Sequence, residues 1–147
     1  MHIVKFVLLI SFIDDGINNG GVSIFINWYF YRRAKMSIQN RETAVKIREL
    51  KSSIPKIVLE NHFDLIPQMK QKYNERFIKL YLEDTAYHIS YLSESVYAGK
   101  PELFNEYLKW AKIFFANLSV SDEDIILNLE LLKQALAAKL PPEMHAI

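Results

Sequence analysis

Residues 68–99, QMKQKYNERFIKLYLEDTAYHISYLSESVYAG, decide the fold that we expect of this chain. The stretch contains no proline, and its one glycine is its last residue. Its apolar and aromatic residues recur at steps of three, four and seven, which keeps one side of a helix facing a core. Gly99 can end this helix in the left-handed conformation, and Pro101 suits the first turn of the next. The pattern predicts a long central helix, which needs packing partners to be stable.

Shorter helices are expected on both sides of this central helix. The apolar spacing predicts them over residues 40–54, 56–63, 100–117 and 121–140, with Asn40 and Ser121 as N-caps. Because the connections are short, successive helices should be antiparallel neighbours. We therefore expect an all-α fold, an antiparallel bundle of four to five helices over residues 36–147. The final EMHAI reads as the start of a further segment, so we expect this domain to be truncated at its C-terminal end.

Residues 1–35 form an apolar N-terminal extension whose composition differs from the rest of the chain. It holds two apolar runs, HIVKFVLLISFI and VSIFINWYFY, joined by DDGINNGG. The β-branched and aromatic residues and the Gly/Asn-rich connector fit a β-hairpin, although neither run alternates cleanly, and short helices are the alternative. The interpretation that we prefer, because the composition changes abruptly near Met36, is that Met36 is the natural start and that residues 1–35 are not native or are poorly ordered. Neither run is long enough to span a bilayer, so a membrane partner is not expected.

Composition excludes several classes of function. The 147 residues carry a net charge of +1, which gives no general attraction to nucleic acid, so no nucleic-acid partner is expected. The chain has no cysteine, which excludes disulfides, thiolate metal sites and cysteine nucleophiles and leaves the cytoplasm as the simplest location. No Gly-rich phosphate loop, GxSxG or HExxH motif occurs. The sequence therefore predicts no catalytic residue and no enzyme.

One polar group on the central helix is a weak candidate for a cofactor-binding site. Tyr81, Asp84, His88 and Tyr91 are three, four and three residues apart, which places them on one stripe beside the apolar face. Asp84 could orient His88 as an acid–base pair or as a pair of ligands. One histidine and one carboxylate do not make a metal site, so none is predicted. The interpretation that we favour is structural: a partly buried Asp84–His88 hydrogen bond that ties this helix to a neighbour.

A set of aromatic residues follows on the next expected helix: Phe104, Tyr107, Trp110, Phe114 and Phe115. Such a set could line a flat cofactor, but aromatics at helical spacing more often form core. Trp110 and Phe115 need not share the face of Phe104, so one of them could instead mark a contact surface. We expect no cofactor in this chain.

A pattern of scattered residues runs from about residue 72 to 142. It comprises Leu82-Glu83-Asp84, Tyr87-His88, Tyr91-Leu92, Gly99, Pro101, Leu103-Phe104, Tyr107, Trp110-Ala111-Lys112 and Leu140-Pro141. This pattern resembles the helical N-terminal region of bacterial cobalamin-binding (B12-binding-domain) regulatory proteins. The resemblance implies a helical module that precedes a cobalamin-binding domain. In that family the corrinoid is held by an Asp-x-His-x-x-Gly motif, which is absent here, so cobalamin is implied only in a downstream domain.

From these observations and the resemblance we expect a non-catalytic helical module with a regulatory or protein-interaction role in a cobalamin-binding regulatory protein, lacking the corrinoid site itself. Its expected partner is another domain of the same protein or a second copy of the chain. Two different functions are also compatible with the sequence. One is a helical small-molecule or haem-type sensor that uses His88, and the other is a membrane-tethered helical adaptor anchored by the N-terminal runs.

Overall fold

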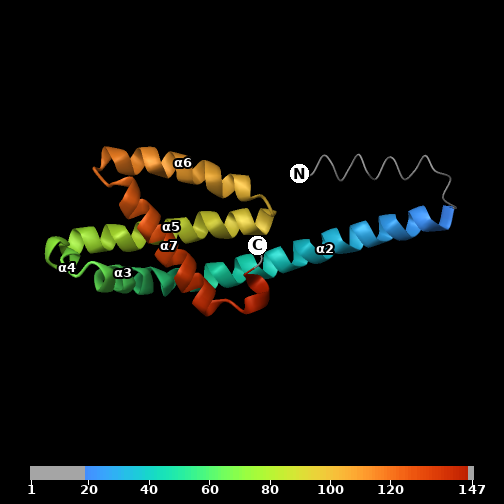
Figure 1. Cartoon of the computed structure of the whole chain (residues 1–147), viewed down its shortest axis with the longest axis horizontal. Helices are drawn as coiled ribbons and strands as arrows, with labels where there is room; N and C mark the ends of the chain where they lie inside the picture. The colour runs from blue at the N-terminus through green and yellow to red at the C-terminus, as the bar shows by residue number, and fades with distance from the viewer. Residues whose placement is uncertain (1–18, 146–147) are drawn as a thin grey trace. The chain divides into compact units, whose positions relative to one another are not determined.

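A computed structural model describes residues 19–145, with side chains from residue 27 onward except that of Lys72. This part of the chain contains α-helices and two short 3₁₀ segments and no strand (Figure 1). The α-helices are α2 (Asn19–Glu49), α3 (Ile54–Leu65), α4 (Met69–Lys72), α5 (Glu75–Ala98), α6 (Pro101–Asn117) and α7 (Asp122–Lys139). The expected all-α fold class is therefore confirmed.

The chain divides into two compact units, Met1–Met36 and Ser37–Ile147, and α2 runs through the boundary between them. Within the second unit, α5 is the central helix. It packs against α3 and α6, and α3 in turn packs against α7. In Figure 1, α5 and α6 form a hairpin, while α7 crosses the other helices at an angle instead of lying antiparallel to α6.

The main core of the second unit lies between α3, α5, α7 and the C-terminal part of α2. Its buried apolar side chains include Ala44, Ile54, Val58, Ile89, Leu131 and Leu132. A smaller cluster lies between α6 and its neighbours and contains Tyr107, Ala111 and Phe115. Burial of the main core supplies the packing that the long central helix α5 requires to be stable. The contact of α6 with the start of α7 thus has a small core of its own.

Local signals set the helix ends where the sequence places them at α5, α6 and α7. Gly99 ends α5 in the left-handed conformation (φ 62°, ψ 33°), and Pro101 begins α6. Ser121 caps α7, because its hydroxyl oxygen accepts a hydrogen bond from the amide of Asp124 at 3.1 Å. Asn74, which was not expected as a cap, caps α5 by accepting from the amide of Phe77 at 2.9 Å.

Three expectations about local structure are wrong. The second apolar run, residues 22–31, belongs to α2, which excludes the β-hairpin and agrees with the helical alternative except that the helix is long. Asn40 lies inside α2 and caps nothing, because the helix already continues through the residues before it. The central helix begins at Glu75, since residues 69–72 form the separate α4 and Tyr73 is extended. The first apolar run, residues 2–13, lies outside the described residues.

A helix that crosses a bilayer needs about 20 predominantly apolar residues. Of the helices in the part of the chain that the structure describes, none has both the length and the apolar character needed to cross a bilayer.

Candidate functional site

Two histidine–tyrosine hydrogen bonds join α5 to the helices on either side of it. His88 of α5 has its Nδ1 2.7 Å from the hydroxyl of Tyr107 in α6. His62 of α3 has its Nδ1 2.9 Å from the hydroxyl of Tyr81 in α5. In both pairs the ring centroids are 5.6 Å apart. The central helix therefore contributes a tyrosine to one pair and a histidine to the other.

A third polar contact ties α5 to α7. The side-chain amide of Asn128 donates to the hydroxyl of Thr85 at 3.1 Å, and that hydroxyl donates to the backbone carbonyl of Tyr81 at 2.9 Å. Thr85 is fully buried and Asn128 is buried as well. Since a buried polar group without a partner is costly, these contacts restrict how α3, α5, α6 and α7 can pack on one another.

Burial keeps the histidine–tyrosine pairs uncharged near neutral pH. His88 is only 3 % exposed, and burial lowers the pKa of its imidazole to about 4. Burial also raises the pKa of the Tyr107 hydroxyl, with a further contribution from the charge of Asp84. In the other pair, burial lowers the pKa of His62 and raises the pKa of Tyr81 to about 12. Proton transfer within either pair is unfavourable, so the geometry suits a structural hydrogen bond better than acid–base chemistry.

The expected hydrogen bond between Asp84 and His88 is not formed. Among the described residues, no hydrogen bond or ion pair joins these two side chains, because the imidazole of His88 turns toward Tyr107 in α6. Asp84 is half-buried near the same hydroxyl, and desolvation raises the pKa of its carboxyl to about 6, with Glu83 adding to the effect. The tie to a neighbouring helix is present, but its partner is a tyrosine.

The four residues of the predicted stripe therefore separate into two environments. Asp84, His88 and Tyr91 face the α6 side of α5, whereas Tyr81 faces His62 in α3. Tyr91 stacks on the ring of Tyr107, with centroids 3.9 Å apart and planes at 10°. The structure thus assembles His88, Tyr91 and Tyr107 into one cluster at the α5–α6 contact.

Sequence reasoning did not assign four members of these contacts to them: His62, Thr85, Tyr107 and Asn128. A usable signal was present, because His62 and Tyr81 are 19 residues apart, and so are His88 and Tyr107. That spacing fits two residues facing each other across a helical hairpin. Two buried atoms of the network, His62 Nε2 and Asn128 Oδ1, have no hydrogen-bond partner among the described residues. Within residues 19–145 there is no group of three His, Asp or Glu side chains that could hold a metal ion.

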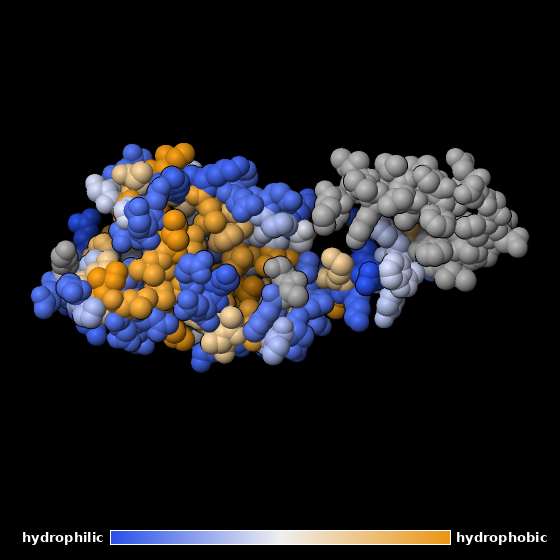
Figure 2. Space-filling view, viewed as in Figure 1, coloured by the Kyte–Doolittle hydropathy of each residue, from blue (hydrophilic) through white to orange (hydrophobic). Residues whose placement is uncertain are grey.

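An exposed aromatic and apolar surface lies next to the His88 cluster. We call it the α5–α6 face; its exposed members are Tyr87, Tyr91, Leu103, Trp110 and Phe114. Leu103, Trp110 and Phe114 recur at steps of seven and four, which puts them on one stripe of α6. The rings of Trp110 and Phe114 stack with centroids 5.3 Å apart, and Trp110 is 59 % exposed. Hydrophobic patches among hydrophilic residues are also visible on the side of this unit drawn in Figure 2.

Comparison with known proteins adds no family to these observations. A scan of the chain against protein-family models finds no match, and neither does a search of curated proteins. The resemblance to cobalamin-binding regulatory proteins accordingly stays a prediction.

Proposed function

We propose that the chain is a non-catalytic interaction module whose α5–α6 face packs against the same face of a second copy. The observation that carries this proposal is the exposure of Tyr91, Leu103, Trp110 and Phe114 on two helices that are already fixed to each other. Contiguous exposed aromatic surface next to a packed core is typical of protein–protein contact sites, where tryptophan and tyrosine contribute most of the binding energy.

The charges beside the stripe favour a second copy as the partner. On one flank of the α6 stripe, Glu102 and Glu106 lie in the N-terminal half of the helix and Lys109 lies at its middle. If two copies of α6 pack antiparallel about a two-fold axis near the middle of the stripe, Glu106 of one copy lies within one turn of Lys109 of the other. Glu106 and Lys109 already form an exposed ion pair at 2.6 Å within one copy, and both remain available at the edge of the contact.

Buried polar contacts support this role by holding the hairpin rigid. The His88–Tyr107 hydrogen bond and the Tyr91–Tyr107 stack fix α6 on α5 directly beneath the exposed stripe. A surface that is already ordered loses less conformational entropy when it binds. The acid–base groups of the α5–α6 contact thus serve to position the face and are not themselves presented to a substrate.

Sedimentation equilibrium of the full chain tests the proposal. We expect concentration-dependent dimerisation, and we expect Trp110→Ser with Phe114→Ser to weaken it by about thirtyfold or more, as for a pair of interface hot spots. Leu65→Ser with Ile126→Ser is the matched control, because these side chains are 62 % and 60 % exposed and lie outside the α5–α6 face. A monomer at every concentration, or equal loss in both variants, would contradict the proposal.

Charge reversal adds an orientation test. Glu106→Lys alone should weaken the dimer, and Glu106→Lys combined with Lys109→Glu should restore much of the affinity, because opposite charges again meet across the axis. A dimer affinity equal to that of the wild type in both variants would exclude the antiparallel arrangement.

The sequence resemblance suggests a narrower version of this function, in which the module belongs to a cobalamin-dependent regulatory protein and the partner is a corrinoid-binding domain. The support for it is the residue pattern over residues 72–142 alone.

A small-molecule or haem-type sensor that uses His88 fits the geometry less well. Its ligand would have to displace the Tyr107 hydroxyl and the ring of Phe115, whose centroid is 6.1 Å from that of His88. A corrinoid or Soret band in the absorption spectrum of the purified chain would favour the sensor over the interaction module.

A further inference from the structure

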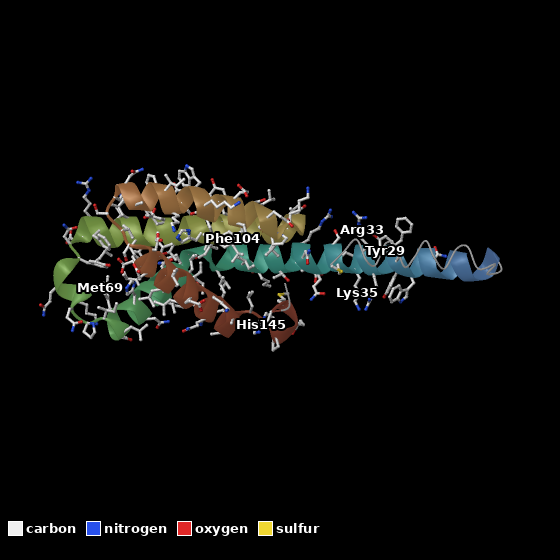
Figure 3. The ribbon with its side chains drawn as sticks, turned by 45° about the horizontal axis from the view of Figure 1, so that its top comes forward. Tyr29, Arg33, Lys35, Met69, Phe104 and His145 are labelled. Carbon is white, nitrogen blue, oxygen red and sulfur yellow. The ribbon has the colours of Figure 1, made fainter. Side chains whose placement is uncertain are left out.

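The N-terminal half of α2 carries a second exposed surface, whose residues are not part of the α5–α6 face. Four consecutive aromatic residues, Trp28, Tyr29, Phe30 and Tyr31, are each more than half exposed. Because they are consecutive on a helix, they point to all sides of it and not to one face. Figure 3 shows Tyr29, Arg33 and Lys35 projecting outward from this helix. A packed helical neighbour would cover one side of such a ring, so the surface calls for a partner that surrounds the helix.

The residues of this segment are ordered along the helix axis by their chemistry. After the polar start Asn19-Gly20-Gly21, the sequence of α2 places apolar residues (Val22, Ile24, Phe25 and Ile26), then the four aromatics, and then Arg32, Arg33 and Lys35. The same order is found where a helix enters a bilayer: apolar side chains in the hydrocarbon, Trp and Tyr at the interface, and Arg and Lys at the headgroups. The guanidinium of Arg32 lies 4.4 Å from the centroid of the Trp28 ring, which places a cation directly at the aromatic level.

The charge of this segment selects an anionic surface. From Gly16 to Arg41 the chain contains no Asp or Glu and four cations, the fourth being Arg41. This local excess contrasts with the net charge of +1 of the whole chain. Basic residues next to a membrane-associated helix are attracted to anionic lipid headgroups.

The length of the segment limits how deep it can reach. Residues 22–31 span about 15 Å of helix, which is roughly half of the ~30 Å hydrocarbon thickness of a bilayer. The expectation that a membrane is not a partner rested on the runs being too short to span. Binding at the interface of one leaflet does not require spanning, and it leaves the polar start of α2 (Asn19, Gly20 and Gly21) outside the hydrocarbon core.

From these observations we propose that α2 binds the interfacial region of an anionic phospholipid membrane through residues 27–35, with Trp28–Tyr31 at the interface and Arg32, Arg33 and Lys35 at the lipid phosphates. The occupant is the lipid surface itself. This inference is independent of the α5–α6 face, because it concerns other residues and another partner.

Fluorescence of Trp28 in the presence of vesicles tests the proposal. In the Trp110→Phe background of the full chain, Trp28 is the single tryptophan. With vesicles of phosphatidylcholine and phosphatidylglycerol, its emission should shift to the blue and should be quenched by lipids brominated near the interface. Phosphatidylcholine alone should bind more weakly, and added salt should reduce the difference. An emission maximum that stays constant on adding anionic vesicles would overturn the proposal.

A charge-removal variant tests the role of the basic residues. Arg32→Gln, Arg33→Gln and Lys35→Gln together should lower partitioning to anionic vesicles by about a hundredfold, at ~1 kcal/mol for each cation near the surface. The matched control is Lys51→Gln with Lys56→Gln and Lys133→Gln, three exposed lysines of the other unit. Equal losses in the two variants would overturn the proposal. So would a blue shift that appears without lipid as the protein concentration rises, because it would assign the aromatic ring to contact between copies.

Discussion

At the residue scale, the hydrogen bond between His88 and Tyr107 explains why two ionisable groups sit inside a helical hairpin. Both side chains are buried and uncharged near neutral pH, and each satisfies the other. The sequence predicted that His88 ties the central helix to a neighbour but named Asp84 as its partner. The sequence shows that Asp84 is four residues from His88 on the same helix. It does not show that Tyr107 lies opposite His88, because that depends on how α6 packs against α5.

Removing either partner should cost stability. We expect His88→Ala to lower the free energy of unfolding by about 1–3 kcal/mol, because the buried Tyr107 hydroxyl then loses its partner. Tyr107→Phe should lower it by a similar amount. Chemical denaturation of both single variants and of the double variant measures the coupling. Additive effects would show that the two groups do not stabilise each other.

The pH dependence of stability should carry opposite contributions from Asp84 and His88. The carboxyl of Asp84 has its pKa raised from 3.8 to about 6 in the folded state, so its contribution to stability falls as pH rises through that range. The imidazole of His88 has its pKa lowered from 6.5 to about 4, so its contribution is lost as pH falls through that range. The lowered pKa of His62 acts in the same direction as that of His88.

Two variants separate these contributions between pH 4 and 6. Asp84→Asn removes the loss of stability that the Asp84 carboxyl causes as pH rises. The unfolding free energy of this variant should therefore rise more steeply with pH than that of the wild type. His88→Gln removes a rising contribution, so its slope should be less positive than that of the wild type. Urea denaturation at a series of pH values measures both slopes. Identical slopes in all three proteins would mean that neither group titrates differently in the folded chain.

At the element scale, the sequence predicted helix ends well wherever one residue type dominates the local energetics. Gly99 and Ser121 act as expected because few residues adopt a left-handed backbone and few cap a helix. The prediction that Asn40 caps a helix is wrong because the residues before it are helical too. A polar residue of the capping type does not by itself indicate where a helix begins. The run VSIFINWYFY failed as a strand because a short apolar run has no periodicity that separates strand from helix.

Gly99 provides the prediction at this scale. Its φ of 62° is unfavourable for other residues, and a Cβ built there would lie 3.0 Å from Nδ2 of Asn40. Gly99→Ala should therefore destabilise the fold by about 1–2 kcal/mol through the left-handed backbone alone. Thermal unfolding followed by circular dichroism measures the loss. Ala98→Gly is a useful contrast, since it weakens the same helix end without a left-handed strain, and an equal or larger loss there would contradict this account.

At the scale of the whole molecule, the second unit directs its buried polar groups to contacts between helices and leaves an aromatic surface exposed on α5 and α6. The sequence predicted the bundle and left open which of Trp110 and Phe115 lies outside the core; Trp110 is the exposed one. It did not predict the exposed stripe on α6, because burial depends on where α7 crosses. The central claim is that this stripe packs on its own copy in antiparallel orientation.

The most direct test is the distance between two copies, measured by pulsed electron resonance on a nitroxide attached at Asn117→Cys. The chain has no other cysteine, and Asn117 is an exposed residue at the end of α6. With Leu103 and Phe114 at the ends of the stripe, antiparallel copies place the two labels roughly 25 Å apart along the axis. Labels within about 10 Å of each other, the spacing of parallel helices in contact, or no dipolar coupling at all, would contradict the account.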